Sequence, residues 1–452
     1  MNLIYGVNDK PKFAQMLVFA FQQVLAILAA TITVPAIVGN GMSAAAALLG
    51  AGVGTIVYQL FTKFKSPVFL GSSFAFIGPM AAAFAGGVSM SLGYAGLIIG
   101  AVFAGLVYVV IALVVKLAGV KWIDKVMPAA VIGPTVALIG LSLAGAAIND
   151  VFSYGAKTDF GVSSYFVMDA KAWVSLACAM VTLFAVVLSS TYGKKMAKMI
   201  PFIIGILAGY AVAAIFTVIG NATANDALKV IDFTLFQNLK IFAVPECTFV
   251  EAIKGVKEIN GSYIATIAVA YIPMAFVVFA EHLADHKNLS SIIGSNLLET
   301  PGLHRTLLGD GVGSMAGAVL GGCPNTTYGE SVGCVAITRN ASVVTITTAA
   351  IVCMVISFFG PFVAFLDSIP GCVMGGVCVT LYGFISVSGL KMIQKVDLNQ
   401  NKNLFTVAAI LIPGIGGMAL GIGSVYVTNI ACALILGIIM NAILSKKKDE
   451  QE

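Results

Sequence analysis

Residues 321–333 read "GGCPNTTYGESVG" and interrupt an otherwise apolar part of the chain. The run contains a carboxylate, Glu330, together with an amide, hydroxyl groups and a proline. A glutamate at the centre of a membrane span costs roughly 3 kcal/mol on insertion scales, and such residues are retained where they are paired or face water. We therefore interpret the run as a polar site within a membrane and not as an ordinary span.

The composition places the whole chain in a membrane. Its 452 residues are 59% hydrophobic and 10% charged, with a mean hydropathy of +1.00, whereas soluble domains are usually about 25% charged. The sequence therefore predicts an all-α polytopic membrane protein. Apolar stretches of about 20 residues, the length that crosses a bilayer, define about fourteen transmembrane segments: 13–37, 43–61, 67–86, 89–115, 127–147, 172–190, 199–219, 262–284, 305–321, 323–338, 343–365, 370–388, 404–420 and 424–445.

The basic residues predict the orientation, because short loops rich in Lys and Arg stay in the cytoplasm. With both termini cytoplasmic, most of the 25 Lys and Arg residues fall on the inner side. We therefore expect a multi-pass protein of the cytoplasmic membrane. The net charge of +5 is an orientation signal, and no basic stretch interleaved with aromatic residues indicates nucleic-acid binding.

The longest polar gap, residues 221–261, divides the chain into two halves of about seven spans each, 1–220 and 262–452. An odd number of spans gives the second half the opposite orientation, so the pattern predicts two inverted seven-span repeats, a plan shared by many secondary transporters. In such proteins a pair of short segments interrupted by Gly or Pro, at corresponding positions of the two halves, indicates the binding site.

Two interrupted segments occupy such positions, since "SPVFLGSSFAFIGP" (66–79) and the 321–333 run are each third in their half. Both are expected to be part strand and part helix, with helices starting near Phe74 and Gly329. The N–H groups at a helix start attract electron-rich oxygens. Taken singly, either segment is equally well explained as a kinked span, but their matched placement favours a site.

The acidic residues inside apolar segments all lie in the second half, at Glu281, Asp285, Asp310 and Glu330. Glu281 and Asp285, in "VVFAEHLADH" (277–286), are four residues apart and share one helix face. Two carboxylates on one face repel each other, and a bound proton relieves that repulsion, so the pair suits a proton-coupled carrier. The alternatives are a solvated helix end at Asp285 and a structural hydrogen bond at Glu281.

The segment around Asp310 carries glycines four residues apart, at Gly309, Gly313, Gly317 and Gly321. Such a ridge lets a neighbouring helix approach closely. Asp310 is then either a partner of the site residues or a polar contact between helices. The ridge and the apolar spans are compatible with a homodimer without requiring one.

Several motifs resemble one known family: "AATITVPAIVG" (29–39), "GSSFAFIGP" (71–79), "AEHLADH" (280–286), "GLHRTLLGDGVGS" (302–314), "PNTTYGESVG" (324–333) with "ITR" (337–339), and "MGGVCVTLYGFISVSGL" (374–390). They are similar to motifs of the nucleobase-ascorbate transporter family, over nearly the whole chain. The "NTTYGE" form resembles the branch of the bacterial uracil permeases, which are uracil:proton symporters.

The resemblance implies a core domain formed by segments 1–4 and 8–11 and a gate domain formed by segments 5–7 and 12–14. It implies no cofactor, with protons as the coupling ion. It places proton coupling at Glu281 and Asp285, the latter standing where some uracil permeases have a histidine. Five substrate-binding residues are implied, with Tyr328 beside the base and Tyr382 facing it from the gate: Ala30, Phe74 (backbone), Glu281, Gly329 (backbone) and Glu330.

Uracil itself has two N–H donors and two carbonyl acceptors around a flat ring. The carboxylates of Glu281 and Glu330 can accept from the N–H groups, and backbone N–H groups near Phe74 and Gly329 can donate to the carbonyls. Two other transport functions remain open, a carrier of xanthine or another purine and an anion transporter or channel. A membrane-embedded enzyme has little support, because the sequence lacks a metal-ligating or nucleophilic cluster.

Overall fold

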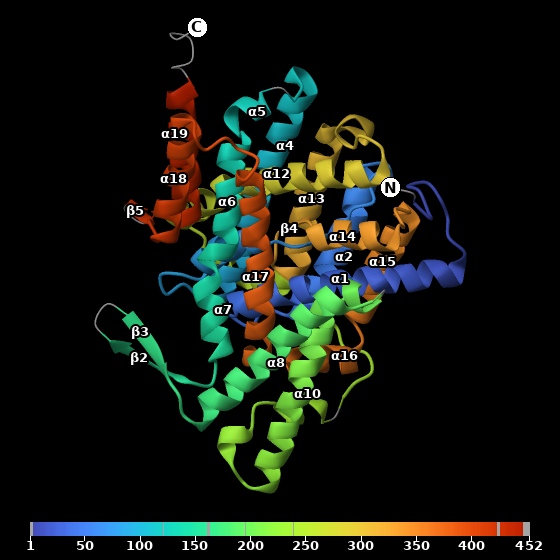
Figure 1. Ribbon diagram of the computed structural model, residues 1–452, viewed down its shortest axis with the longest axis vertical. Helices are drawn as coiled ribbons and strands as arrows, with labels where there is room; N and C mark the ends of the chain where they lie inside the picture. Colours follow the sequence, from blue (N-terminus) through green and yellow to red (C-terminus); the bar gives the residue numbers. More distant parts are fainter. Residues whose placement is uncertain are drawn as a thin grey trace. The chain divides into compact units, whose positions relative to one another are not determined.

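The structure, a computed structural model, describes residues 3–120, 122–160, 163–194, 196–237, 239–422 and 425–445. The outermost ends of the predicted repeats, residues 1–2 and 446–452, lie outside this part. The described chain is predominantly helical. Eight of its helices are long and apolar enough to cross a membrane, so the protein is a multi-pass helical membrane protein (Figure 1). The count of about fourteen spans in two inverted repeats stays a prediction.

The chain divides into two compact units, of which the first comprises residues 1–142, 245–355 and 385–452. The predicted core and gate domains are not tested by this division. The first unit holds α1 (Phe13–Val38), α2 (Ala44–Phe61), β1 (Leu70–Ser72), η1 (Phe74–Phe76), α3 (Ile77–Ala83), α4 (Met90–Ala118), α5 (Ile123–Val126), α6 (Ala129–Ser142), α11 (Thr248–Gly255), η4 (Val256–Glu258), α12 (Gly261–Ile293), η5 (Leu298–Gly302), α13 (Leu303–Gly321), β4 (Asn325–Thr327), α14 (Gly329–Thr338), most of α15 (Val343–Ile356), α18 (Asn401–Ile415), β5 (Leu420–Ile422), β6 (Val425–Val427) and α19 (Asn429–Ser445).

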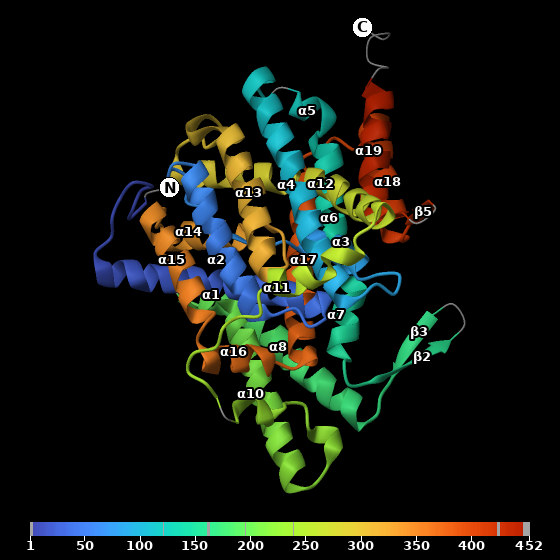
Figure 2. The ribbon, with the colours of Figure 1, turned by 180° about the vertical axis from the view of Figure 1, so that it is seen from behind.

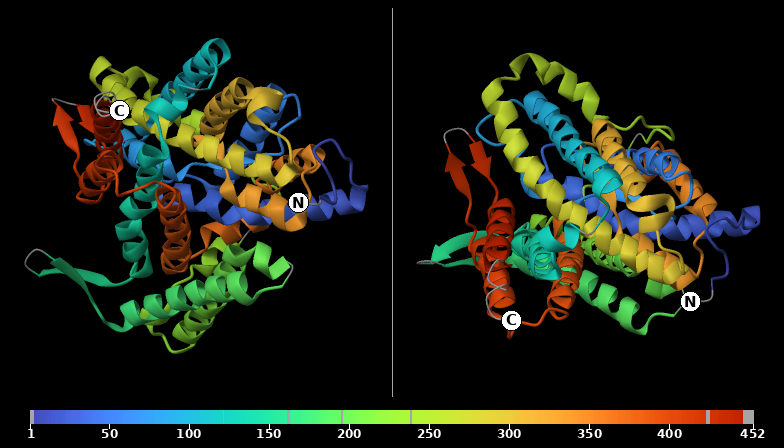
Figure 3. Two further views of the ribbon diagram at one scale, coloured as in Figure 1. Left: turned by 45° about the horizontal axis from the view of Figure 1, so that its top comes forward. Right: turned by 90° about the horizontal axis from the view of Figure 1, so that it is seen from above.

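The second unit comprises residues 143–244 and 356–384, and α17 (Gly371–Ile393) contributes to both units. Its helices α8 and α10, coloured green, lie side by side (Figure 3). It holds α7 (Ala144–Val151), β2 (Ala156–Phe160), β3 (Ser163–Val167), α8 (Ala170–Tyr192), α9 (Met196–Met199), α10 (Pro201–Ala222), η2 (Asp226–Leu228), η3 (Phe233–Phe236) and α16 (Gly360–Asp367).

Local sequence explains where the helices of the first unit begin and end. Ser43 and Ser89 accept hydrogen bonds from backbone N–H groups at the starts of α2 and α4, as N-cap residues do. Asn260 does the same for α12. Gly322 ends α13 in the left-handed conformation, at φ 73°, which glycine adopts without a steric penalty.

Some predicted spans differ from the observed helices. The span predicted over 343–365 is broken between α15 and α16, where Pro361 is accommodated in the first turn of α16. The helix predicted over 262–284 continues to Ile293. The predicted loop 221–261 contains short helical turns and α11, because residues 248–255 form an amphipathic helix whose buried face includes Ala252 and packs against α4.

The glycine ridge packs α13 against α2, and the two helices run side by side (Figure 2). A methyl group added at Gly313 would lie 2.7 Å from the carbonyl oxygen of Gly54, and one added at Gly321 would lie 2.6 Å from that of Ala46. The interpretation of the ridge as a packing surface is therefore confirmed. Because the ridge is buried within one chain, it is not available for contact with a second copy.

Candidate functional site

The two interrupted segments meet in the first unit as a pair of short antiparallel strands. Leu70 of β1 lies opposite Thr327 of β4, and Ser72 lies opposite Asn325. The backbone N–H of Ser73 extends the pairing by donating to the Pro324 carbonyl at 3.0 Å. Every residue of both strands is buried. The extended stretches predicted in segments 3 and 10 are thus observed.

A helix begins directly after each strand, η1 at Phe74 and α14 at Gly329. These are the helix starts expected from the sequence. Neither preceding residue, Ser73 or Tyr328, caps its helix through its side chain. The start of α14 can therefore present backbone N–H groups to an oxygen ligand.

Polar side chains satisfy the extended backbone, which would otherwise be tolerated only beside a water-filled cavity. The Thr55 hydroxyl of α2 accepts from the Leu70 N–H at 2.9 Å and also lies 3.2 Å from the Leu70 carbonyl oxygen. The Asn325 amide donates to the Gly50 carbonyl at 3.0 Å. Helix α2 therefore holds both strands in place.

Three carboxylates gather beside the start of α14. The Thr327 hydroxyl of β4 donates to Asp285 Oδ2 at 2.7 Å. A methyl group added at Gly329 would lie 3.7 Å from Asp285 Oδ1, so Asp285 reaches the first residue of the helix. Glu281 lies one turn before Asp285 on the same face of α12, and α12 contacts both β4 and α14, whose first turn carries Glu330.

This arrangement decides one of the alternatives for Asp285. It is not a solvated helix end, because α12 continues two turns beyond it, to Ile293, and its side chain is held by Thr327. The Glu281 carboxylate forms no hydrogen bond with another residue of the described chain, so the alternative of a structural hydrogen bond finds no support there. Glu281 is partly exposed, which leaves its oxygens accessible.

The other predicted site residues lie in several environments. Ala30 is buried on α1 at 1% exposure, and Phe74 is half-buried at the start of η1. Tyr328 braces the strand pair, because its ring covers Gly71 and its hydroxyl donates to the Ser72 carbonyl at 2.8 Å. Tyr382 is buried in the second unit, and its expected place opposite the substrate stays a prediction.

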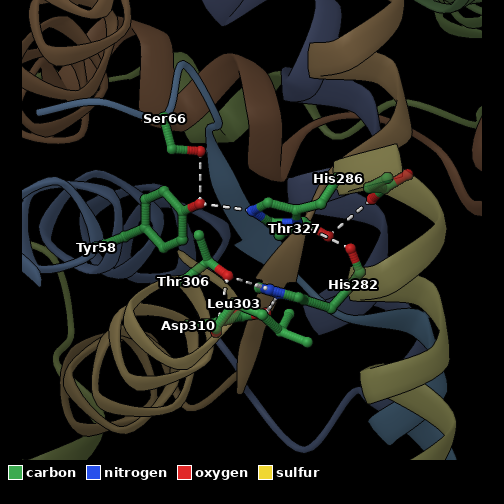
Figure 4. Close-up of polar contacts among 9 residues, drawn as sticks. Tyr58, Ser66, His282, His286, Leu303, Thr306, Asp310 and Thr327 are labelled. Carbon is green, nitrogen blue, oxygen red and sulfur yellow. Dashed lines mark hydrogen bonds and ion pairs between the residues drawn. The ribbon is translucent and has the colours of Figure 1, made fainter. Parts of the chain in front are cut away.

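A buried polar network, which sequence reasoning missed, lies on another face of α12 (Figure 4). His282 Nδ1 is 2.7 Å from Asp310 Oδ2, and its Nε2 is 3.0 Å from the Thr306 hydroxyl. His286 Nε2 is 2.7 Å from the Tyr58 hydroxyl, which is 2.7 Å from that of Ser66. Asp310 is therefore a polar contact between α13 and α12. The sequence did contain a signal for this network, because two histidines four residues apart on an apolar helix lie on the same face.

A side-chain hydrogen bond ties α1 to α14, one of the two roles that the sequence allows for Gln23. The Gln23 amide donates to the Ser331 hydroxyl, which also accepts from the backbone N–H of Phe69 at 3.3 Å. Gln23 thus hydrogen-bonds between helices. The contact fixes the first turn of α14 against both α1 and the chain that enters β1.

Interrupted helices that present polar groups inside an apolar bundle are the building plan of membrane transport proteins, and the first unit follows it. The particular family is shown by sequence: a family of transporters described as "Permease family", covering xanthine and uracil permeases, matches residues 14–422. The chain belongs to this family, the nucleobase-ascorbate transporters.

Bacterial permeases are among its relatives. It is 37% identical over 450 residues to a uracil permease from Bacillus subtilis, with 99% of this chain and 96% of the relative covered. It is 36% identical over 452 residues to the uracil permease of Bacillus caldolyticus, with 99% and 96% covered. The uracil permease of Escherichia coli is 33% identical over 440 residues, with 97% and 93% covered.

Solved structures of other transporters share the fold. The transmembrane domain of the cyanobacterial bicarbonate transporter BicA matches 96% of this chain and 100% of its own, with a TM-score of 0.63 and 16% identity. The murine anion transporter Slc26a9 matches 97% of this chain and 69% of its own, with a TM-score of 0.63 and 12% identity. At these identities the likeness concerns the fold alone.

Proposed function

We propose that the protein imports uracil together with protons across the cytoplasmic membrane, with both of its termini in the cytoplasm. The observation that carries the proposal is that Asp285 reaches the start of α14, where Glu330 lies, with Glu281 one turn away on the same face of α12. The names of the relatives support uracil as the substrate.

The site offers the hydrogen-bonding complement of uracil. Glu281 and Glu330 accept from the two N–H groups of the base, and the backbone N–H groups at Phe74 and Gly329 donate to its carbonyls. Ala30 provides an apolar wall on α1. A base that lacks one of these groups is rejected, because a buried partner in the protein would be left unsatisfied.

Proton coupling follows from the crowding of the three carboxylates. Like charges this close favour binding of a proton by one of them, and Glu281 and Asp285 are the residues that we assign to it. A proton bound with the substrate reduces the negative charge of the site. Less buried charge is then present when the site switches from facing one side of the membrane to facing the other. Alternating access by a gate domain that includes Tyr382 completes the proposed cycle.

Uptake of labelled uracil into proteoliposomes tests the proposal. The purified protein is assayed with and without an inward proton gradient, in competition with unlabelled uracil, xanthine and thymine. Accumulation that requires the gradient and is blocked by uracil but not by xanthine is the expected result. Uptake that ignores the gradient would refute proton coupling, and the absence of any uracil uptake would refute the substrate.

A further inference from the structure

Each of the two α12 carboxylates in the site is followed in the chain by a buried histidine, Glu281 by His282 and Asp285 by His286. Consecutive residues of a helix project about 100° apart, so the histidines face away from the carboxylates. Both histidines are completely buried, and their rings stack with centroids 3.9 Å apart. They take no part in the proposed binding of substrate.

The hydrogen bonds of His286 determine its tautomer. Its Nδ1 is 2.8 Å from the backbone carbonyl oxygen of His282, which only accepts, so Nδ1 carries a proton. No ion pair of the described chain involves His286, and a buried imidazolium without an opposite charge in contact is strongly unfavourable. His286 is therefore neutral, and its Nε2 accepts from Tyr58, whose oxygen accepts in turn from Ser66.

The hydrogen bonds of His282 determine how many protons it shares with Asp310. The Thr306 hydroxyl donates to the Leu303 carbonyl at 3.0 Å, and its single proton is used there. Thr306 must then accept from His282 Nε2–H. A second proton lies between His282 Nδ1 and Asp310 Oδ2, which are 2.7 Å apart. The buried pair thus holds two protons and has no net charge, on whichever atom the second one resides.

These bonds join α12 to two different helices at positions one turn apart. His282 is bound to α13 through Asp310 and Thr306, and His286 is bound to α2 through Tyr58. Two anchors separated by one turn hold both the rotation and the axial position of a helix. A rotation of α12 that broke them would leave buried polar groups unsatisfied, at about 1–3 kcal/mol for each group.

We propose that His282 and His286 are positioning residues, which hold α12 by their hydrogen bonds to α13 and α2 so that Glu281 and Asp285 face the start of α14. A test of this positioning role by substrate affinity rests on the proposed function. A test by the protonation states of the two histidines does not, because these states are properties of the protein without substrate.

Nuclear magnetic resonance of protein labelled with ¹⁵N-histidine tests the protonation states in the wild type. The chain has three histidines, and the variant His304→Gln removes the remaining one and completes the assignment. We expect His286 protonated at Nδ1 only, and His282 protonated at Nε2 with a proton shared at Nδ1. His286 protonated at Nε2, or either histidine titrating as an exposed one does, would overturn the proposal.

Substrate measurements test the positioning role. Tyr58→Phe removes the partner of His286 Nε2, and His286→Asn removes the nitrogen itself. We expect each variant to raise the uracil Kd and the transport KM about tenfold with an unchanged maximal rate. Because both variants break the same hydrogen bond, the Kd and KM of the double variant should not exceed the larger values of the two single variants. The control His304→Gln should match the wild type.

Unchanged Kd and KM in folded Tyr58→Phe and His286→Asn proteins would overturn the positioning role. Failure of the wild type to bind uracil would instead refute the proposed substrate. The resonance experiment would still test the hydrogen bonds by which His282 and His286 hold α12.

Discussion

At the scale of single residues, the candidate site is distinguished by its three carboxyl groups, Glu281, Asp285 and Glu330. In the described part of the chain, ion pairs join Lys229 with Asp226 and Lys254 with Glu251, and a proton-sharing contact joins His282 with Asp310. None of these contacts involves a carboxylate of the site. The proposed substrate, uracil, is uncharged and brings no counter-charge. Protons are then the simplest means of relieving the repulsion among Glu281, Asp285 and Glu330, which is why we assign the coupling to this cluster.

Glu281→Gln is expected to abolish concentrative uptake of uracil. The amide keeps the size of the side chain and an acceptor oxygen but cannot bind and release a proton. In proteoliposomes, this variant should retain a larger fraction of the wild-type rate for exchange of labelled with unlabelled uracil without a gradient than for gradient-driven accumulation. Full accumulation by this variant would remove Glu281 from the coupling.

Thr327→Val is expected to raise the uracil KM about tenfold, because a hydrogen bond to a charged group contributes about 1.5–3 kcal/mol. Without the hydroxyl, Asp285 loses the bond that holds it beside Gly329. Thr327→Ser retains the hydroxyl and serves as the control. Equal KM values for the valine and serine variants would show that the bond does not position Asp285.

At the scale of elements, close packing of small residues places the strands. The α2 and α13 helices approach so closely that the Asn325 side chain fits between Gly54 and Gly317. The same side chain donates to the Gly50 carbonyl. The position of β4, and with it the start of α14, therefore depends on the absence of side chains along this contact.

Gly313→Ala is expected to destabilise the protein by about 1–3 kcal/mol, as overpacking of a close contact does. The new methyl group would lie 2.7 Å from the Gly54 carbonyl oxygen and 2.8 Å from Leu70 Cδ1. Thermal unfolding can be followed with a thiol-reactive dye, since most cysteines are buried. The control is Gly333→Ala, whose methyl group meets nothing within 4 Å; an equal loss in both variants would contradict the packing argument.

The contact between α11 and α4 is expected to weaken in acid. The Lys254 ammonium and the Ser91 hydroxyl, each 2.5 Å from a Glu251 oxygen, hold the pKa of that carboxyl below its ordinary value. A lowered pKa in the folded state contributes stability above the ordinary carboxyl pKa of about 4.3, and this stability is lost as pH falls through the lowered pKa.

The comparison of wild type with Glu251→Gln measures this effect. The wild type should have the higher Tm at pH 7, and the difference should shrink as the pH is lowered below about 4. A difference in Tm that does not change with pH would mean that the Glu251 charge is not what stabilises the contact. Because the group is at the surface, the effect is expected to be small.

At the scale of the whole molecule, the two strands come from the two predicted repeats. β1 lies in the first half and β4 in the second, and they pair in antiparallel directions. Antiparallel pairing of corresponding segments is consistent with repeats of opposite orientation. The predicted plan has an even number of spans, which would place both ends of the chain on one side of the membrane.

The orientation can be measured with an epitope tag fused to each terminus. Both tags are expected to be cleaved by protease in inside-out vesicles and protected in right-side-out vesicles. The reason is the excess of Lys and Arg in the loops that share a side with the termini. Tags cleaved on opposite sides would require an odd number of spans and exclude the inverted seven-span repeats.

The sequence alone was sufficient for the membrane class, the two interrupted segments and the packing role of the glycines at 309–321. These properties depend on local composition and spacing, which can be recognised from residues that are close together in the sequence. The helix starts at Phe74 and Gly329 were predictable for the same reason, since Gly, Pro and hydroxyl residues end one kind of backbone structure and begin another.

Only the tertiary structure decided which polar groups meet. The pairing of β1 with β4, the bond from Thr327 to Asp285 and the contact of His282 with Asp310 join residues that are distant in sequence. Such contacts depend on the rotation and axial position of each helix against its neighbours. Helical periodicity specifies a shared face but not the partner that this face meets, because apolar surroundings offer a helix many orientations of similar energy.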